Sequence, residues 1–154
     1  MTEILEAKTP DDFRSARALF EQYAQSLGFD LGFQDFAAEL QSLPGEYASS
    51  QGCIILAKHN NRIVGCVALR KWDETISEMK RLYVIPEARG NGIGRKLAEE
   101  VILRAKEMGY KRMRLDTLAS MEAANRLYSS LGFRPITPYR YNPLAGAQFY
   151  ELSL

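Results

Sequence analysis

The chain has 154 residues with 20 basic and 19 acidic side chains, so its formal net charge is only +1. This length fits one folded domain over residues 1–154, and the near-neutral charge argues against nucleic acid or a membrane surface as a partner. No apolar run reaches the roughly 18 residues of a membrane span. The start, Met1-Thr2-Glu3-Ile4, lacks the basic and apolar regions of a signal peptide. We therefore expect a cytoplasmic protein.

The residue patterns predict alternating strands and helices. In chain order these are a strand at 3–8, helices from Asp11 and over 33–43, strands at 52–59, 62–70 and 75–85, a helix over 93–108, a strand at 111–117, a helix capped by Ser120 and a closing strand at 148–152. Both faces of the strand at 75–85 carry apolar groups, which suits a central strand. Hairpins mixed with βαβ-like units predict a mixed sheet with helices on both faces.

Metal-binding side chains are scarce. The two cysteines, Cys53 and Cys66, lack metal-ligand spacing, and His59 is the single histidine. We therefore expect no metal site and place both cysteines on neighbouring strands as small core residues.

A glycine-rich loop, Arg89-Gly90-Asn91-Gly92-Ile93-Gly94, connects the strand at 75–85 to the helix over 93–108. Its glycines let the backbone approach a ligand closely, and the N–H groups at the start of the helix favour an anion. A pyrophosphate is the ligand this pattern predicts, and a turn without a ligand is the alternative.

Two other phosphate-binding loops fit this segment poorly. A Walker A loop needs Lys-Ser or Lys-Thr after its last glycine, where this chain has Arg95-Lys96-Leu97. A dinucleotide-binding fingerprint needs a third glycine at Arg95, although Asp116 imitates its ribose-binding acid.

The segments 78–86 and 89–94 resemble motif A of the GNAT family of N-acetyltransferases, and the run from Ala123 to Phe133 resembles its motif B. The order of predicted elements resembles that family over nearly the whole chain. The resemblance implies a single α/β domain with a mixed, mostly antiparallel sheet of six to seven strands and about four helices on both faces. It also implies acetyl-CoA as co-substrate.

On the donor side, the resemblance implies that the backbone of Leu82 and Val84 pairs with the pantetheine arm of acetyl-CoA, with Asn125 near that arm. Backbone groups of a strand splayed from its neighbour would otherwise lack partners. The implied pyrophosphate-binding residues are Arg89, Gly90, Asn91, Gly92, Ile93, Gly94 and Arg95.

Two catalytic roles follow from the same resemblance. Tyr128 would protonate the departing thiolate, and Glu78 or a water chain would take the proton of the acceptor amine. We expect burial among apolar residues to raise the pKa of Glu78. The alternatives are a core aromatic for Tyr128, and for Glu78 a salt bridge with Lys80, Arg81 or a neighbouring strand.

The acceptor side is less specific. Its candidate residues are Tyr23, Phe29, Phe33, Trp72, Tyr139, Tyr141 and Asn142, of which we favour Tyr139 and Tyr141. The expected acceptor is the primary amine of a small molecule, with a peptide or protein amine open, and the chain is expected to be a monomer or homodimer. A non-catalytic acyl-CoA-binding protein is the alternative function.

Overall fold

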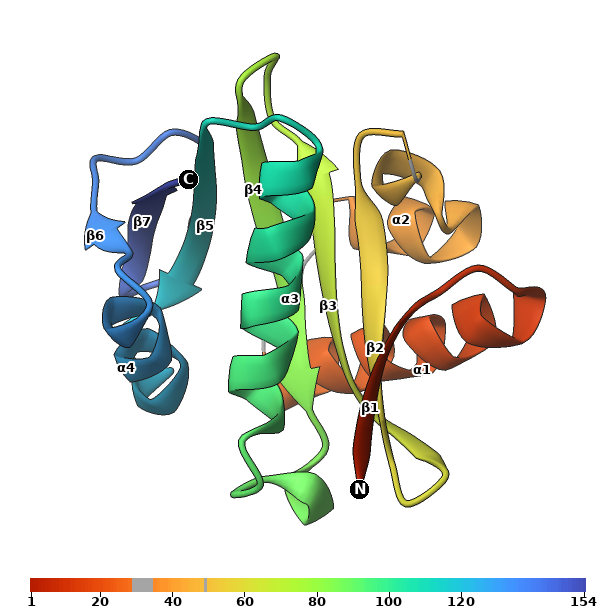
Figure 1. Ribbon diagram of the computed structural model, residues 1–154. Helices are drawn as coiled ribbons and strands as arrows, with labels where there is room; N and C mark the ends of the chain where they lie inside the picture. The colour runs from red at the N-terminus through yellow and green to blue at the C-terminus, as the bar shows by residue number, and fades with distance from the viewer. Residues whose placement is uncertain (29–34, 49) are drawn as a thin grey trace.

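The computed structural model describes residues 1–28, 35–48 and 50–154 (Figure 1). Its elements are β1 (Thr2–Glu6), α1 (Pro10–Leu27), α2 (Phe36–Ser42), the 3₁₀ turn η2 (Gly45–Tyr47), β2 (Cys53–His59), β3 (Arg62–Lys71), β4 (Ile76–Val84), the 3₁₀ turn η3 (Pro86–Ala88), α3 (Ile93–Glu107), β5 (Arg112–Leu118), α4 (Glu122–Ser130), β6 (Arg134–Pro135) and β7 (Ala147–Ser153). The predicted order of elements is confirmed.

The strands form one seven-stranded sheet in the order β1-β2-β3-β4-β5-β7-β6. All neighbours are antiparallel except β4 and β5, which are parallel. Helices α3 and α1 lie on opposite faces (Figure 1), and β3 and β4 between them are largely buried. The predicted mixed, mostly antiparallel sheet with helices on both faces is therefore confirmed. The two-residue β6 was not predicted, because it is too short to carry a periodic pattern.

Local sequence determines where α1 begins and ends. The Thr9 hydroxyl accepts a hydrogen bond from the Asp12 N–H at 3.1 Å, and the Asp12 carboxylate accepts one from the Thr9 N–H at 3.1 Å. This capping box is followed by Pro10 at the first helical position, and Gly28 ends the helix at φ 70°. Helix α4 differs from the prediction, because Met121 and not Ser120 precedes it and no side chain caps it.

Strand β4 separates from β5 part-way along its length. The two pair only over Ile76–Glu78 and Arg112–Arg114. Beyond Glu78, β4 contains a bulge at Arg81, a non-glycine residue at φ 62°. The buried Arg81 guanidinium donates two hydrogen bonds of 2.9 Å to Glu39 of α2, which holds the bulge in place. The result is a V-shaped opening between the ends of two central strands.

The cysteine prediction is also confirmed, since Cys53 on β2 and Cys66 on β3 are both buried. Within residues 1–28, 35–48 and 50–154, no helix is both long and apolar enough to cross a membrane.

Candidate acetyl-transfer site

A groove of about 660 Å³ lies along the separated end of β4 and the start of α3, with α4 as its other wall. Seven of the residues predicted for the donor side line it: Leu82, Val84, Arg89, Gly90, Gly92, Ile93 and Gly94. Sequence reasoning missed Arg126 of α4, which adds a cation to the same groove.

Backbone geometry prepares the floor of this groove for an anion. Gly90 and Gly92 have φ values of 86° and 73°, which side chains other than glycine rarely adopt. Gly92 precedes α3 without a side-chain cap, so the N–H groups of the first helical turn point to the loop without partners inside the helix. The Nε–H of Arg89 donates to the Val84 carbonyl at 2.9 Å, which fixes this arginine beside the loop.

Three other predicted donor-side residues lie outside the groove lining. The Asn91 amide donates to the Ala88 carbonyl at 3.0 Å and so closes the loop. The Arg95 guanidinium turns to the Ser130 hydroxyl at 2.5 Å. Both residues can still offer backbone N–H groups.

Asn125, the third of them, connects α4 to the end of β5. Its amide N–H donates to the Leu118 carbonyl at 2.9 Å, and its amide oxygen accepts from the Thr117 hydroxyl at 2.9 Å. The partner that a mid-helix asparagine requires is therefore inside the protein, and contact of Asn125 with pantetheine stays a prediction.

A second, smaller pocket lies between the splayed strands. Tyr23, Leu82 and Met121 line both this pocket and the groove, so the two spaces meet. Its volume of about 30 Å³ has room for one or two water molecules. A small polar head group is what this space accommodates.

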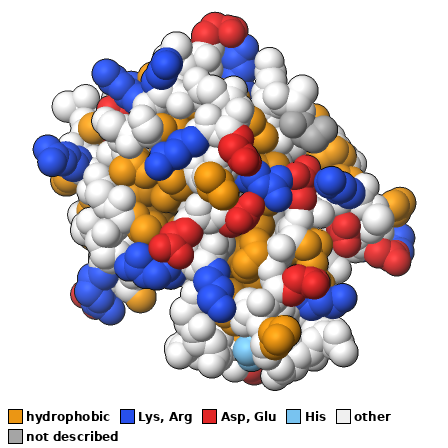
Figure 2. All heavy atoms as spheres, in the orientation of Figure 1, with side chains coloured by type: hydrophobic (Ala, Val, Ile, Leu, Met, Phe, Trp, Pro, Cys, Tyr) orange, Lys and Arg blue, Asp and Glu red, His pale blue; other side chains and the backbone are white. Residues whose placement is uncertain are grey.

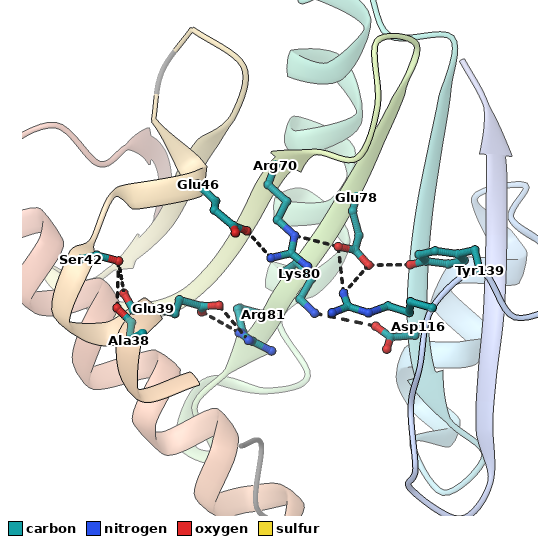
Figure 3. Close-up of polar contacts among 11 residues, drawn as sticks. Ala38, Glu39, Ser42, Glu46, Arg70, Glu78, Lys80, Arg81, Asp116 and Tyr139 are labelled. Carbon is teal, nitrogen blue, oxygen red and sulfur yellow. Dashed lines mark hydrogen bonds and ion pairs between the residues drawn. The ribbon is translucent and has the colours of Figure 1, made fainter. Parts of the chain in front are cut away.

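Two opposite charges line the small pocket. Lys80 of β4 and Asp116 of β5 lie with Nζ and Oδ1 4.0 Å apart, and their side chains are 2% and 6% exposed (Figure 3). The Asn142 amide donates to the other Asp116 oxygen at 3.0 Å. Burial lowers the pKa of Lys80, and the charge of Arg81 lowers it further, to about 7, despite the nearby carboxylates.

Glu78 is fully buried at the point where β4 leaves β5. It accepts hydrogen bonds from the Arg70 Nε at 2.8 Å, the Tyr139 hydroxyl at 2.7 Å and the Arg140 guanidinium at 3.0 Å, and Figure 3 shows it between Arg70 and Tyr139. Burial alone raises the pKa of Glu78, but the charge of Lys80, those of the two arginines and the tyrosine hydroxyl lower it to about 2.

The prediction that Glu78 has a raised pKa is therefore wrong. Burial was anticipated correctly, but the cations around the carboxylate outweigh it. The alternative of a salt bridge to a neighbouring strand is confirmed, with Arg70 of β3 as the partner. A carboxyl group with so low a pKa holds a proton only weakly, and three hydrogen-bond donors already contact its oxygens. Glu78 is therefore a poor general base.

Tyr128 lines the small pocket and is 6% exposed. Its ring packs against Phe133 and Tyr150, with centroids 5.7 Å and 6.5 Å away. Burial raises the pKa of the Tyr128 hydroxyl above its usual value, so this group keeps its proton at neutral pH. Tyr128 is both a core aromatic and a potential proton donor beside the pocket.

Known proteins resemble this chain over most of its length. The family profile described as "Acetyltransferase (GNAT) family" matches residues 9–133. The chain belongs to the GNAT family. An N-acetyltransferase of Schizosaccharomyces pombe, itself uncharacterised, is 36% identical over 149 residues, which are 96% of this chain and 91% of that protein. This member of the GNAT family is accordingly an N-acetyltransferase.

Solved structures show the GNAT fold as well. An acetyltransferase of the family from Staphylococcus aureus has a TM-score of 0.82 at 25% identity, over 99% of both chains. The Salmonella typhimurium protein YncA, solved with its cofactor acetyl-CoA, has a TM-score of 0.68 at 21% identity, over 99% of this chain and 93% of that one.

The residues predicted for the acceptor side are only partly those that line the small pocket. Tyr139 and Tyr141 do not line the small pocket: the Tyr139 hydroxyl binds Glu78, and Tyr141 is 73% exposed. Tyr23 and Asn142 line it instead. Trp72 packs on Tyr139 with ring centroids 4.9 Å apart. The candidates Phe29 and Phe33 lie outside the described residues.

The charges of the GNAT chain are mixed over the face that α3 covers, with blue and red side chains interspersed in Figure 2. In the described part of the chain, no group of three or more histidine, cysteine, aspartate or glutamate side chains is placed to hold a metal ion.

Proposed function

We propose that the chain transfers the acetyl group of acetyl-CoA directly to the primary amine of a small molecule. The observation that carries this proposal is the meeting of the groove and the small pocket at Tyr23, Leu82 and Met121. One space suits a long anionic donor, and the other suits an amine head group between Asp116 and Tyr128.

The residues of the groove fit acetyl-CoA. The first-turn N–H groups of α3 and the guanidinium groups of Arg89 and Arg126 would hold its pyrophosphate. The backbone of Leu82 and Val84, on the edge of β4 that has left β5, would pair with the amides of its pantetheine arm. Acetyl-CoA, when bound, would supply the acetyl group as a reactive thioester.

Asp116 is the base that the geometry favours. Its carboxylate lines the pocket and accepts one hydrogen bond from Asn142, which leaves acceptor capacity on its other oxygen. An ammonium in the pocket would give its proton to Asp116, and the neutral amine would then attack the thioester carbon. Tyr128 would donate its proton to the sulfur as the carbon–sulfur bond breaks, and would regain one from the amide nitrogen that forms.

The test of the function is release of free thiol from acetyl-CoA with a library of primary amines, together with thermal shifts by coenzyme A, NAD and ATP. We expect coenzyme A to raise the melting temperature and at least one amine to release thiol. Stabilisation without thiol release from any amine would favour the non-catalytic acyl-CoA binder. Stabilisation by NAD or ATP alone would exclude the donor assignment.

The variant Gly94→Ala tests donor binding, because we expect it to keep the fold and to weaken the binding of coenzyme A. Gly94 has ordinary helical geometry, and a Cβ there would meet the nearest atom, of Leu127, at 3.9 Å, so the fold tolerates it. Alanine in place of glycine stabilises a helix by up to about 1 kcal/mol. Gly94 lines the groove, so we expect an added methyl group there to raise the Kd for coenzyme A roughly tenfold by weakening charged hydrogen bonds to its pyrophosphate. Calorimetric titration measures the Kd for coenzyme A, and urea unfolding measures the change in stability. An unchanged Kd would mean that the pyrophosphate does not bind beside Gly94.

Tyr128→Phe tests the proton donor. Phenylalanine keeps the ring packing on Phe133 and Tyr150, so we expect a normal melting temperature and a normal Kd for coenzyme A. Loss of a general acid lowers kcat by about 100-fold or more. Steady-state thiol release measures kcat, and wild-type turnover would leave Tyr128 as a core aromatic only.

A further inference from the structure

The junction of the groove and the small pocket is formed by Tyr23, Leu82 and Met121, which line both spaces. An amine in the pocket attacks a thioester in the groove only when the two reacting atoms lie about 3–3.5 Å apart. The thioester carbon of a bound donor therefore lies at this junction, and the carbon chain of its acyl group starts there. The side chains of the junction thus limit how long that chain can be.

Little space is left around the junction for a longer acyl chain. The pocket beyond it has a volume of about 30 Å³, and the amine of the acceptor takes part of this volume. The pocket wall includes buried core side chains, namely Met79, Leu115, Leu118 and Tyr128. Such side chains are close-packed and do not move aside without cost. In the other direction the pantetheine arm occupies the groove, so a chain longer than acetyl requires room at the junction itself.

Two of the three junction residues are fixed by other contacts. The Tyr23 ring packs edge-on against Tyr83, with ring centroids 6.2 Å apart, and lies 5.9 Å from the Arg81 guanidinium. Leu82 belongs to β4, and its side chain packs against the core. Met121 is the third, and it is partly buried at the start of α4.

Met121 is held at the junction by its neighbours in the chain. Its N–H donates to the Leu118 carbonyl at 2.9 Å, and its carbonyl accepts from the Asn125 N–H at 3.0 Å. The Sδ atom contacts the Thr117 hydroxyl at 3.7 Å. Both the backbone and the thioether of Met121 are therefore seated against the end of β5, and its long unbranched side chain takes up space beside the thioester.

We propose that Met121 is a specificity-determining residue that restricts the donor to acetyl-CoA, by occupying the space into which a propionyl or butyryl chain would extend. This inference rests on the proposed function and deepens its donor side. It does not depend on which amine is the acceptor.

The test measures the Kd of coenzyme A, acetyl-CoA and butyryl-CoA by calorimetric titration, which requires no acceptor. Coenzyme A has the same pyrophosphate and pantetheine arm but no acyl group, so its Kd reports on the fold and the groove alone. We expect the wild type to bind butyryl-CoA at least roughly tenfold more weakly than acetyl-CoA. Met121→Ala removes the side chain beyond Cβ. In this variant we expect the two Kd values to agree within about threefold and that of coenzyme A to stay unchanged.

Met108→Ala is the matched control. Met108 is also partly buried, but it follows the far end of α3 and lines neither the groove nor the pocket. We expect this variant to keep the wild-type preference for acetyl-CoA. If Met121→Ala does not fold, Met121→Ser is a second variant with a short side chain, and its hydroxyl can cap α4, which has no side-chain cap.

The outcomes separate this inference from the proposed function. Equal binding of acetyl-CoA and butyryl-CoA by the wild type overturns the role of Met121 and leaves the donor assignment standing. A tenfold preference that persists in Met121→Ala does the same. Absence of coenzyme A binding by the wild type refutes the proposed function, and this inference with it.

Discussion

Replacing Glu78 by glutamine is expected to lower the free energy of unfolding by about 3 kcal/mol at neutral pH, within the 3–5 kcal/mol typical of a broken buried ion pair. The side chain is fully buried and accepts hydrogen bonds from Arg70, Arg140 and Tyr139. Glutamine fills the same volume but leaves the two guanidinium groups near a neutral amide. The cost is therefore electrostatic, and urea unfolding measures it.

The pH dependence gives this prediction a second readout. The pKa of Glu78 is lowered from 4.5 to about 2 in the folded chain. Because this pKa is lowered, ionised Glu78 stabilises the folded state fully above pH 4.5, and this stabilisation is lost as the pH falls towards 2. The difference between the wild type and Glu78→Gln should therefore shrink to about half or less at pH 3.

A matched control is available at the second carboxylate that pairs with Arg70. Glu46 also pairs with Arg70, but its side chain is 69% exposed. Exposed ion pairs contribute about 0–1 kcal/mol, so Glu46→Gln should change stability little. If Glu78→Gln unfolds like the wild type but loses kcat, the carboxylate acts in the chemistry and the role of base returns to Glu78.

The case of Glu78 shows what sequence could and could not predict. Its burial followed from the apolar residues around it in a central strand, and that prediction is correct. Of the charges that lower its pKa, that of Lys80 is two positions away on the same strand, but those of Arg70 on the next strand and of Arg140, 62 positions away, are brought in by the fold. No local pattern records which charges the fold brings to a buried carboxylate.

The donor groove and the small pocket differ, for the same reason, in how much of each could be predicted from the sequence. The glycine loop and the start of α3 are contiguous in sequence, so most of the donor groove could be predicted from Arg89 to Gly94. The small pocket is assembled from α1, β4, β5, α4 and the loop that contains Asn142. Asp116 resembled the ribose-binding acid of a different fold, and its place opposite Lys80 follows only from the divergence of β4 and β5.

Replacing Asp116 by asparagine is expected to lower kcat/KM by 100-fold to 10,000-fold at neutral pH, the range for loss of a general base. Asparagine has the same shape and keeps an oxygen for the Asn142 amide, and Lys80 lies 4.0 Å from Asp116, beyond hydrogen-bond distance, so we expect a smaller loss of stability than in Glu78→Gln and unchanged binding of coenzyme A. A surface change of the same type, Asp11→Asn, should leave the rate unchanged, because Asp11 is exposed at the start of α1.

The pH profile distinguishes a base from a binding group at this position. If Asp116 takes the proton, the variant depends on amine already deprotonated in solution, so its rate should rise with pH towards the amine pKa near 10 and approach the wild type. If Asp116 only holds the ammonium, KM rises and the profile keeps its wild-type shape. If Lys80 is the base, removing the neighbouring carboxylate makes its neutral form more abundant, and the variant keeps its rate near pH 7. Only the first of these results is compatible with Asp116 as the group that activates the acceptor.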